Sequence, residues 1–264
     1  MRTALELLTF QNTAPGAVFT AMTALIGDSG VLRNTQKSIK LLAAWQNRQA
    51  AGNTRILSPL LHDNVRGIQF SSSAGLELGF GLTQTPYQEL FPQDTLSFSG
   101  TGSAVAGDIE QSSILVRYED LPGIDGNFIT SEQLQKRFVN KFGVRTVLGQ
   151  TVVTGQYDGS SAINATEDAL KANTEYAILG LTIGVGAATS IGLRSPDWGN
   201  LRVGVPASAA PAVTSDWFYR LSLFSKLACI PVFNSSNKGT TLVDYSDNET
   251  STGSQPVIQL AELK

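Results

Sequence analysis

The segment Leu76-Glu77-Leu78-Gly79-Phe80 decides the fold class, because its apolar residues occupy every second position. Successive side chains of a β-strand point to opposite faces of a sheet, so these apolar side chains share one face. Other short segments rich in Val, Ile, Leu, Phe or Thr are bounded by Gly, Pro, Asn, Asp or Ser, as strands are. The predicted strands are Val65 to Phe70, Leu76 to Leu82, Thr95 to Phe98, Ser113 to Tyr118, Thr146 to Val153, Ala177 to Val185, Thr240 to Tyr245 and Val257 to Leu263.

Strands at this close spacing predict a mainly β protein, and a sandwich rather than a parallel sheet, because most of them lack a helical crossover between them. A few short helices interrupt the pattern. One is predicted from Thr35 to Ala51, with Asn34 as its N-cap, and another from Ser131 to Phe142, with Thr130 and Gln133 as a capping box. A shorter helix is predicted after Asn164, through Lys171. In the segment Trp217 to Phe224, the apolar residues fit the period of a helix and that of a strand equally well.

The composition supplies little material for chemistry. The 264 residues include one His and one Cys, and 16% are charged. A formal charge of -3 argues against broad coating of nucleic acid, which needs clustered Lys and Arg. Glu6, Gln11 and Asn12 interrupt the apolar N-terminal stretch, so we do not predict a signal peptide there. We therefore predict a structural protein, not an enzyme, with no catalytic, cofactor-binding or metal-binding residue.

Each residue that could carry chemistry also has a plainer interpretation. His62 stands outside any nucleophile motif and is interpreted as a turn residue. Cys229 lies in an apolar run and is interpreted as a buried hydrophobe. Gly180, Gly184 and Gly186 lack the Lys and Ser or Thr of a phosphate loop, so close packing in a strand explains them. The carboxylates between Asp94 and Glu132 are interpreted as charges on loops and at the edges of sheets.

One basic segment is a candidate binding surface. No acid occurs between Asp28 and Asp63, whereas the same segment contains several Lys and Arg residues. On the predicted first helix, a spacing of 3.6 residues per turn would gather Lys37, Lys40 and Arg48 near one side. Such a face can contact anionic lipid or nucleic acid, although most such faces are merely solvated. The candidate inward-facing basic helix comprises Arg33, Lys37, Lys40 and Arg48.

The chain also contains a faint internal repeat. Thr95 to Phe98 leads through a polar loop to Ser113 to Tyr118, and Thr241 to Tyr245 leads through a similar loop to Pro256 to Leu260. The Pro and two Gly residues of Leu121 to Gly126 punctuate the chain between the two halves. We therefore predict two domains, residues 1–124 and 125–264.

The chain has two similar halves, loops rich in Gly, Ser and Thr, and few reactive residues. In these features the whole chain resembles the double jelly-roll major capsid proteins of tailless, membrane-containing icosahedral bacteriophages. The resemblance is architectural and carries over no functional residue. It implies two tandem jelly-roll sandwiches and a capsid subunit whose homotrimers form pseudo-hexagonal capsomers of an icosahedral virion. The implied partners are neighbouring capsomers and an internal membrane or minor capsid proteins, without sequence-specific nucleic acid, after assembly in the host cytoplasm.

Two other classes remain open. A carbohydrate-binding or adhesive β-sandwich needs an exposed aromatic ring, for which Trp198 on its predicted turn is the best candidate. The plainer interpretation of Trp198 is packing under a loop. A β-sandwich hydrolase that uses only carboxylates would depend on Asp108 or Glu110.

Overall fold

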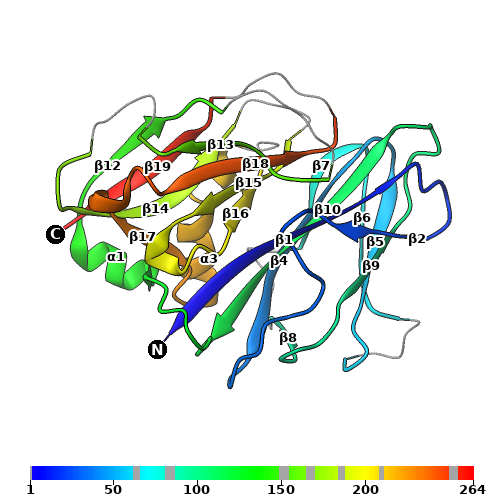
Figure 1. The fold of residues 1–264 in the computed structure, drawn as a ribbon, viewed down its shortest axis with the longest axis horizontal. Helices are drawn as coiled ribbons and strands as arrows, with labels where there is room; N and C mark the ends of the chain where they lie inside the picture. Colours follow the sequence, from blue (N-terminus) through cyan, green and yellow to red (C-terminus); the bar gives the residue numbers. More distant parts are fainter. Residues whose placement is uncertain are drawn as a thin grey trace.

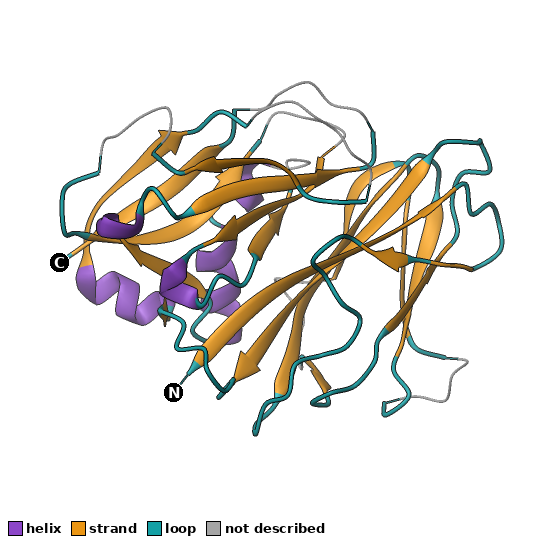
Figure 2. Ribbon diagram, in the orientation of Figure 1, coloured by secondary structure: helices purple, strands orange, loops and turns teal. Residues whose placement is uncertain are grey.

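The structure is a computed structural model, and it describes residues 2–61, 66–80, 87–148, 155–164, 170–183, 188–207, 211–249 and 255–264. It is mainly β, with several antiparallel sheets and few helices, as Figure 2 shows. The prediction of a mainly β chain is confirmed. None of the described helices is long and apolar enough to cross a membrane.

The first half of the chain forms two sheets. The larger is a 6-stranded sheet in the order β3-β1-β10-β4-β7, with β8 also paired to β4, and the smaller is a 4-stranded sheet in the order β2-β9-β5-β6. The strands are β1 (Thr3–Thr13), β2 (Thr20–Ala21), β3 (Thr23–Ala24), β4 (Ile39–Arg48), β5 (Gly52–Leu57), β6 (Ile68–Ser72), β7 (Gly75–Phe80), β8 (Gln88–Leu90), β9 (Ser97–Gly100) and β10 (Ile109–Glu119).

The second half forms two further sheets, which lie on the left in Figure 1. One is 5-stranded in the order β11-β17-β14-β19-β12, and the other is 4-stranded in the order β13-β18-β15-β16. The elements are β11 (Phe128–Ile129), α1 (Ser131–Arg137), β12 (Phe138–Arg145), β13 (Asp158–Ala162), β14 (Glu175–Thr182), β15 (Ala188–Arg194), η1 (Pro196–Trp198), β16 (Val203–Pro206), α2 (Pro211–Thr214), α3 (Trp217–Ser225), β17 (Ile230–Asn234), η2 (Ser235–Asn237), β18 (Leu242–Asp247) and β19 (Val257–Leu263).

The two halves share one order of strand pairing. In the first half the main paths are β1-β10-β4-β7 and β2-β9-β5-β6, and in the second they are β12-β19-β14-β17 and β13-β18-β15-β16. Counted along the chain within each half, without the short β3, β8 and β11, one sheet runs first, eighth, third, sixth and the other second, seventh, fourth, fifth. Among the described residues, no strand of one half shares a sheet with a strand of the other.

The β1-β10-β4 sheet is buried on both faces, and this fixes how the halves sit together. Leu5 and Leu7 of β1 belong to a core shared with the second half, whereas Ala4 and Leu8 belong to a core inside the first half. Alternate side chains of a strand point to opposite faces, so the same sheet closes both cores. The second half meets this sheet through β15 and β16, and α3 contributes the Trp217 ring, which packs edge-on against Trp45 of β4 at 5.9 Å.

The predicted helix from Thr35 to Ala51 is wrong, because this segment contains strand β4. Ile39–Arg48 pairs with β10 on one side and with β7 and β8 on the other. A strand buried on both faces is apolar on both sides, so its sequence lacks the alternation that marks a half-buried strand. Without that signal, Asn34 resembled the N-cap of a helix.

The second predicted helix is confirmed at its start and wrong at its end. Thr130 and Gln133 form the expected capping box at the start of α1. The chain leaves the helix at Phe138, where β12 begins and pairs along β19, so long-range pairing outweighs the helical pattern of Phe138 and Phe142. The ambiguous segment Trp217 to Phe224 forms helix α3. The helix predicted after Asn164 falls mainly on residues 165–169, outside the described residues.

Most predicted strands have counterparts, and one matches at both ends. Val257 to Leu263 is β19, whereas Ser113 to Tyr118 is the end of the longer β10. Thr146 to Val153 falls largely on residues 149–154, which lie outside the described residues. The interrupted N-terminal stretch forms β1, whose central position in a sheet explains its apolar residues.

Candidate functional site

The four predicted site cations do not form a common basic face. The Arg33 guanidinium binds Glu6 of β1 at 2.6 Å, and Lys37 binds Asp120 at 2.7 Å. Lys40 lies 3.7 Å from the Glu119 carboxylate. Because the segment is a strand and the loop before it, the 3.6-residue spacing that gathered these cations does not apply, and the helix predicted to carry the basic face is not formed.

Arg48 is buried inside the first half. Its guanidinium donates to the Thr101 carbonyl at 2.6 Å, to Gln46 Oε1 at 3.0 Å and to the Thr54 hydroxyl. Burial lowers the pKa of Arg48 to about 10, and the negative charge of Glu110 opposes this shift. The side chain therefore ties β4 to β5 and the loop after β9, and it is not available to an external ligand.

The three Trp rings are all buried, so Trp198 has the packing role of its plainer interpretation and is not the exposed ring that a carbohydrate site would need. Trp198 is 0% exposed and donates its indole N–H to the Leu201 carbonyl at 3.1 Å. Its turn, η1, packs against β17 of the same half, and the ring also contacts Phe128. The carbohydrate-binding hypothesis thereby loses its candidate stacking ring.

The predicted carboxylates anchor loops. Glu110 accepts from the backbone N–H groups of Ser103 at 2.7 Å and Gln49 at 2.9 Å, and Asp108 accepts from the Ser103 hydroxyl at 2.5 Å. Asp108 is a loop charge, as predicted, whereas Glu110 lies buried within the central strand β10, so the prediction of a loop or edge charge is wrong for Glu110. Within the described ranges, no three His, Cys, Asp or Glu side chains converge as metal ligands would.

The other sequence candidates have separate outcomes. Cys229 is buried, as predicted, and burial raises the pKa of its thiol to about 11. A Cβ on Gly180 would meet the backbone of Thr214 and Ser215, so close packing explains this glycine. His62, Gly184 and Gly186 lie outside the described residues.

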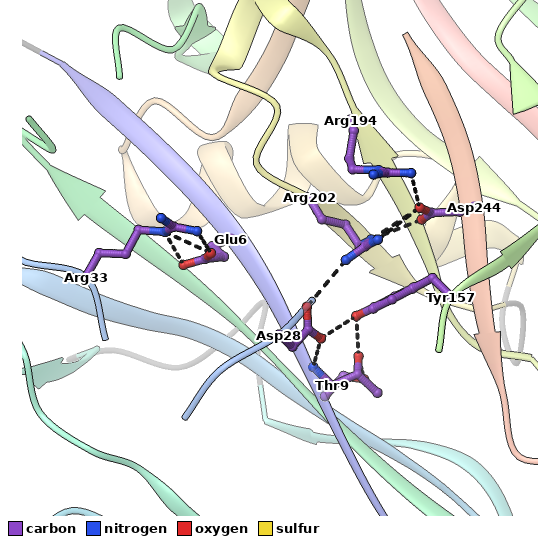
Figure 3. Close-up of polar contacts among 9 residues, drawn as sticks. Glu6, Thr9, Asp28, Arg33, Tyr157, Arg194, Arg202 and Asp244 are labelled. Carbon is purple, nitrogen blue, oxygen red and sulfur yellow. Dashed lines mark hydrogen bonds and ion pairs between the residues drawn. The ribbon is translucent and has the colours of Figure 1, made fainter. Parts of the chain in front are cut away.

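The structure instead gathers charged side chains at the seam between the two halves, and Figure 3 shows how they converge. We call this set the seam cluster. It combines groups from β1, the loop after β3 and the loop before β4 with groups next to β13, β15, β16 and β18. Its members are Glu6, Thr9, Asp28, Arg33, Tyr157, Arg194, Arg202 and Asp244.

Arg202 is the centre of the seam cluster. Its guanidinium binds the Asp244 carboxylate through three contacts of 3.1 to 3.3 Å, and its Nη1 lies 3.4 Å from Asp28 Oδ1 in the first half. The same guanidinium stacks over the Tyr157 ring at 3.5 Å. Arg194 adds a contact of 3.2 Å to Asp244. One cation therefore links acids from both halves of the chain.

Asp28 is a buried acid whose surroundings raise its pKa. Its side chain is only 3% exposed, and burial raises its pKa to about 7. The backbone N–H of Thr9 at 2.7 Å, the Arg202 charge and the Tyr157 hydroxyl at 2.9 Å each lower the pKa, whereas the Glu6 charge raises it. A carboxyl with this pKa changes charge near neutral pH.

The second carboxylate, Glu6, is fully occupied by neighbours. It accepts two N–H groups of Arg33, at 2.6 and 2.9 Å, and the Tyr118 hydroxyl at 2.8 Å. Burial and the adjacent Glu6 charge raise the pKa of Tyr118, so its hydroxyl stays protonated as a donor.

A cavity of about 150 Å³ lies among Glu6, Asp28, Arg33, Arg194 and Arg202. Sites for drug-sized ligands span roughly 300 to 1,000 Å³, so this space suits a few water molecules or a small ion. Paired charges around so small a space are suited to joining the two halves.

Sequence reasoning missed the seam cluster, although a signal existed. Asp244 lies within the predicted strand Thr240 to Tyr245, where an acid among apolar residues indicates a buried partner. The partner, Arg202, is distant in sequence and could be found only from the fold.

Comparisons with known proteins add no argument about function. No family model and no curated protein matches the chain. Among solved structures, the PBSX exported protein XepA aligns at 9% identity over 96% of this chain and 86% of that chain, with a TM-score of 0.19. The major capsid protein P2 from Bacteriophage PM2 aligns at 10% identity over 98% of each chain, with a TM-score of 0.21. Recombinant N-glycanase F aligns at 11% identity over 99% of this chain and 96% of that chain, with a TM-score of 0.23. At such TM-scores these likenesses are too low to support an inference.

Proposed function

We propose that this chain is a virion structural protein, a capsid subunit built from two tandem jelly rolls, residues 1–124 and 125–264. The observation that carries the proposal is the strand order, first-eighth-third-sixth and second-seventh-fourth-fifth, which occurs in both halves. Jelly rolls consist of eight strands in two facing sheets, which agrees with this pairing. The proposed role is structural rather than catalytic.

The seam supports a shell-forming role, because it makes the two halves one rigid block. A subunit that tiles a shell must present its contact surfaces in a fixed relative orientation. The core shared between the halves and the Arg202 contacts to Asp28 and Asp244 supply that orientation here. Interfaces of this kind, large and apolar, restrict relative domain motion.

In the proposed assembly, three copies associate as a homotrimer and form a pseudo-hexagonal capsomer. Two similar rolls per chain give six similar blocks around the threefold axis, and closed rotational symmetry is the usual arrangement of homo-oligomers. Neighbouring capsomers and an internal membrane or minor capsid proteins are the proposed partners, in an icosahedral virion assembled in the host cytoplasm. Because Arg33, Lys37, Lys40 and Arg48 are paired or buried, the inward contact is not assigned to them.

One surface of the first roll is suited to contacts between copies. Val18 and Val105 are 75% and 64% exposed. Their loops are held together by hydrogen bonds from Gly16 N–H to the Ser103 carbonyl and from Gly102 N–H to the Gly16 carbonyl, both 2.9 Å. Exposed apolar side chains mark protein contact sites where they adjoin one another, and these backbone bonds bring the two loops together. We propose this tip, Val18 with Val105, as one subunit contact.

The test is the native mass of purified protein at low and high concentration, with negative-stain images of the same samples. We expect a trimer that forms hexagonal plates or shells. Val18→Asp with Val105→Asp should reduce assembly, whereas Leu60→Asp, a matched change beyond the other end of β5, should not. A monomer at every concentration would contradict the capsid proposal. Normal assembly of the double variant would exclude only the tip.

A further inference from the structure

A chain of hydrogen bonds crosses the seam from Trp45 to Asp28. The Trp45 indole N–H lies 2.9 Å from Ser190 Oγ, which lies 2.8 Å from Ser113 Oγ. Ser113 Oγ lies 2.8 Å from Thr9 Oγ1, and Thr9 Oγ1 lies 2.8 Å from the Tyr157 hydroxyl. The Tyr157 hydroxyl reaches Asp28 Oδ2 at 2.9 Å, as Figure 3 shows.

Water cannot replace the inner links, because Trp45, Thr9, Ser113 and Ser190 are each 0% exposed. Each hydroxyl in the chain has one proton and must donate it in one direction. An ionised carboxylate only accepts, and an indole N–H only donates. The Tyr157 hydroxyl is placed to donate either to Thr9 Oγ1 or to Asp28 Oδ2, and its one proton can serve only one of them. When Asp28 is ionised it takes this proton, Thr9 then donates to Tyr157, and every link points from Trp45 through the hydroxyls to Asp28.

We propose that Asp28 is a proton switch in the seam, and that binding of one proton reverses the hydroxyl chain and weakens the Trp45 hydrogen bond to Ser190. The proton arrives from solvent through the small cavity that Asp28 lines. A protonated Oδ2 donates to Tyr157, Tyr157 then donates to Thr9, and the reversal continues to Ser190.

At the end of the hydrogen-bond chain remote from Asp28, the single Trp45 N–H has two acceptors, so a change at one acceptor shifts the N–H toward the other. Besides Ser190 Oγ, the Trp45 N–H lies 3.0 Å from the Thr189 carbonyl. A hydroxyl that donates onward is a stronger acceptor than one that only accepts, because hydrogen bonds in series polarise one another. Ser190 donates onward to Ser113 only while Asp28 is ionised. On protonation the Trp45 N–H therefore shifts toward Thr189.

The surroundings place this change near neutral pH. Burial raises the pKa of Asp28 to about 7. The charged and titratable groups that face Asp28 are Glu6 from β1, Arg202 with Asp244 behind it, and Tyr157. The pKa of Tyr157 is well above its usual range, so this hydroxyl stays protonated throughout. Arg33 and Tyr118 bind Glu6, and Arg194 binds Asp244.

The test follows the indole ¹H–¹⁵N signals and the Asp28 carboxyl ¹³C signal between pH 5 and pH 9. We expect the Trp45 N–H signal to move to lower field as pH rises, with the midpoint of the Asp28 titration. Trp198, whose indole N–H bonds to the Leu201 carbonyl, is the internal reference and should stay fixed. Asp28→Asn should abolish the Trp45 titration.

Two variants separate the chain from a direct field effect. Ser113→Ala interrupts the chain and should leave Asp28 titrating while Trp45 no longer responds. Thr9→Val, which keeps the side-chain shape and the backbone N–H to Asp28, should do the same if Ser113→Ala does not fold. A Trp45 signal that titrates unchanged in the folded variants would overturn the proposal. So would a native protein in which Trp45 stays fixed, or in which Asp28 does not titrate in this range. The test does not depend on capsid assembly.

Discussion

Two buried charged side chains, Arg48 and Asp28, lie at sites that accept few other residues. Arg48 and Asp28 are each surrounded by protein, yet they are compensated differently. Arg48 has neutral acceptors around its guanidinium, whereas Asp28 has the Arg202 charge and two donors. A buried charge that loses its partners costs several kcal/mol, so both sites discriminate sharply between side chains.

The pH dependence of stability follows from Asp28. Its pKa is about 7 in the folded protein, against an ordinary value of 3.8 for an aspartate in water, so the folded state holds the proton more tightly. The resulting stabilisation is complete below about pH 4 and is lost as pH rises through about 7. We expect the free energy of unfolding to fall by on the order of 1 to 4 kcal/mol between pH 5 and pH 9 through this group. Urea titrations should show a flatter profile for Asp28→Asn, and an equal slope in both proteins would contradict the assignment.

Arg48→Lys should destabilise the first half, although it keeps the charge. A lysine ammonium cannot reach the Gln46, Thr54 and Thr101 oxygens at once, so buried acceptors lose their donors. We expect a loss of about 2 kcal/mol in urea unfolding. Arg2→Lys is the control, because Arg2 is exposed, and it should change stability by less than about 0.5 kcal/mol. Equal effects of the two substitutions would refute this account of Arg48.

Among the helices and strands, the sequence predicted correctly those features that depend on residues close together in the chain. The capping box of Thr130 and Gln133 marked the start of α1, and β19 was found at both ends. The strand β4 was missed because segments remote in sequence cover both of its faces, so its side chains do not alternate between apolar and polar. The seam cluster was missed for the same reason, since Arg202 and Asp28 meet only after both halves have folded.

The capping box gives a prediction at this scale. Thr130→Ala removes the acceptor for the Gln133 backbone N–H, which lies 3.1 Å from Thr130 Oγ1. We expect a loss of about 1 kcal/mol in the free energy of unfolding, the usual effect of losing an N-cap. Thr130→Ser retains the hydroxyl and should remain close to the native value. If the serine variant loses as much as the alanine variant, the cap is not the cause.

For the whole molecule, the seam determines whether the halves unfold together. Arg202→Met leaves Asp244 and Asp28 buried without their shared cation, and such a loss typically costs about 3 to 5 kcal/mol. We expect its calorimetric transition to separate into two, because the halves lose their coupling. Arg194→Met, at a side chain 36% exposed, should retain one transition. A single, equally stable transition in the Arg202 variant would show that the apolar seam suffices.

The doubly buried β1-β10-β4 sheet also has a consequence for the chain during its synthesis. All three strands have been synthesised once β10 is complete, whereas β15 and β16, which cover their outer face, come much later in the chain. Until then Leu5, Leu7 and Trp45 form an uncovered apolar surface on a nascent chain, the kind of surface that chaperones bind and that promotes aggregation. The rate of translation between β10 and β16 therefore sets how long that surface stays exposed.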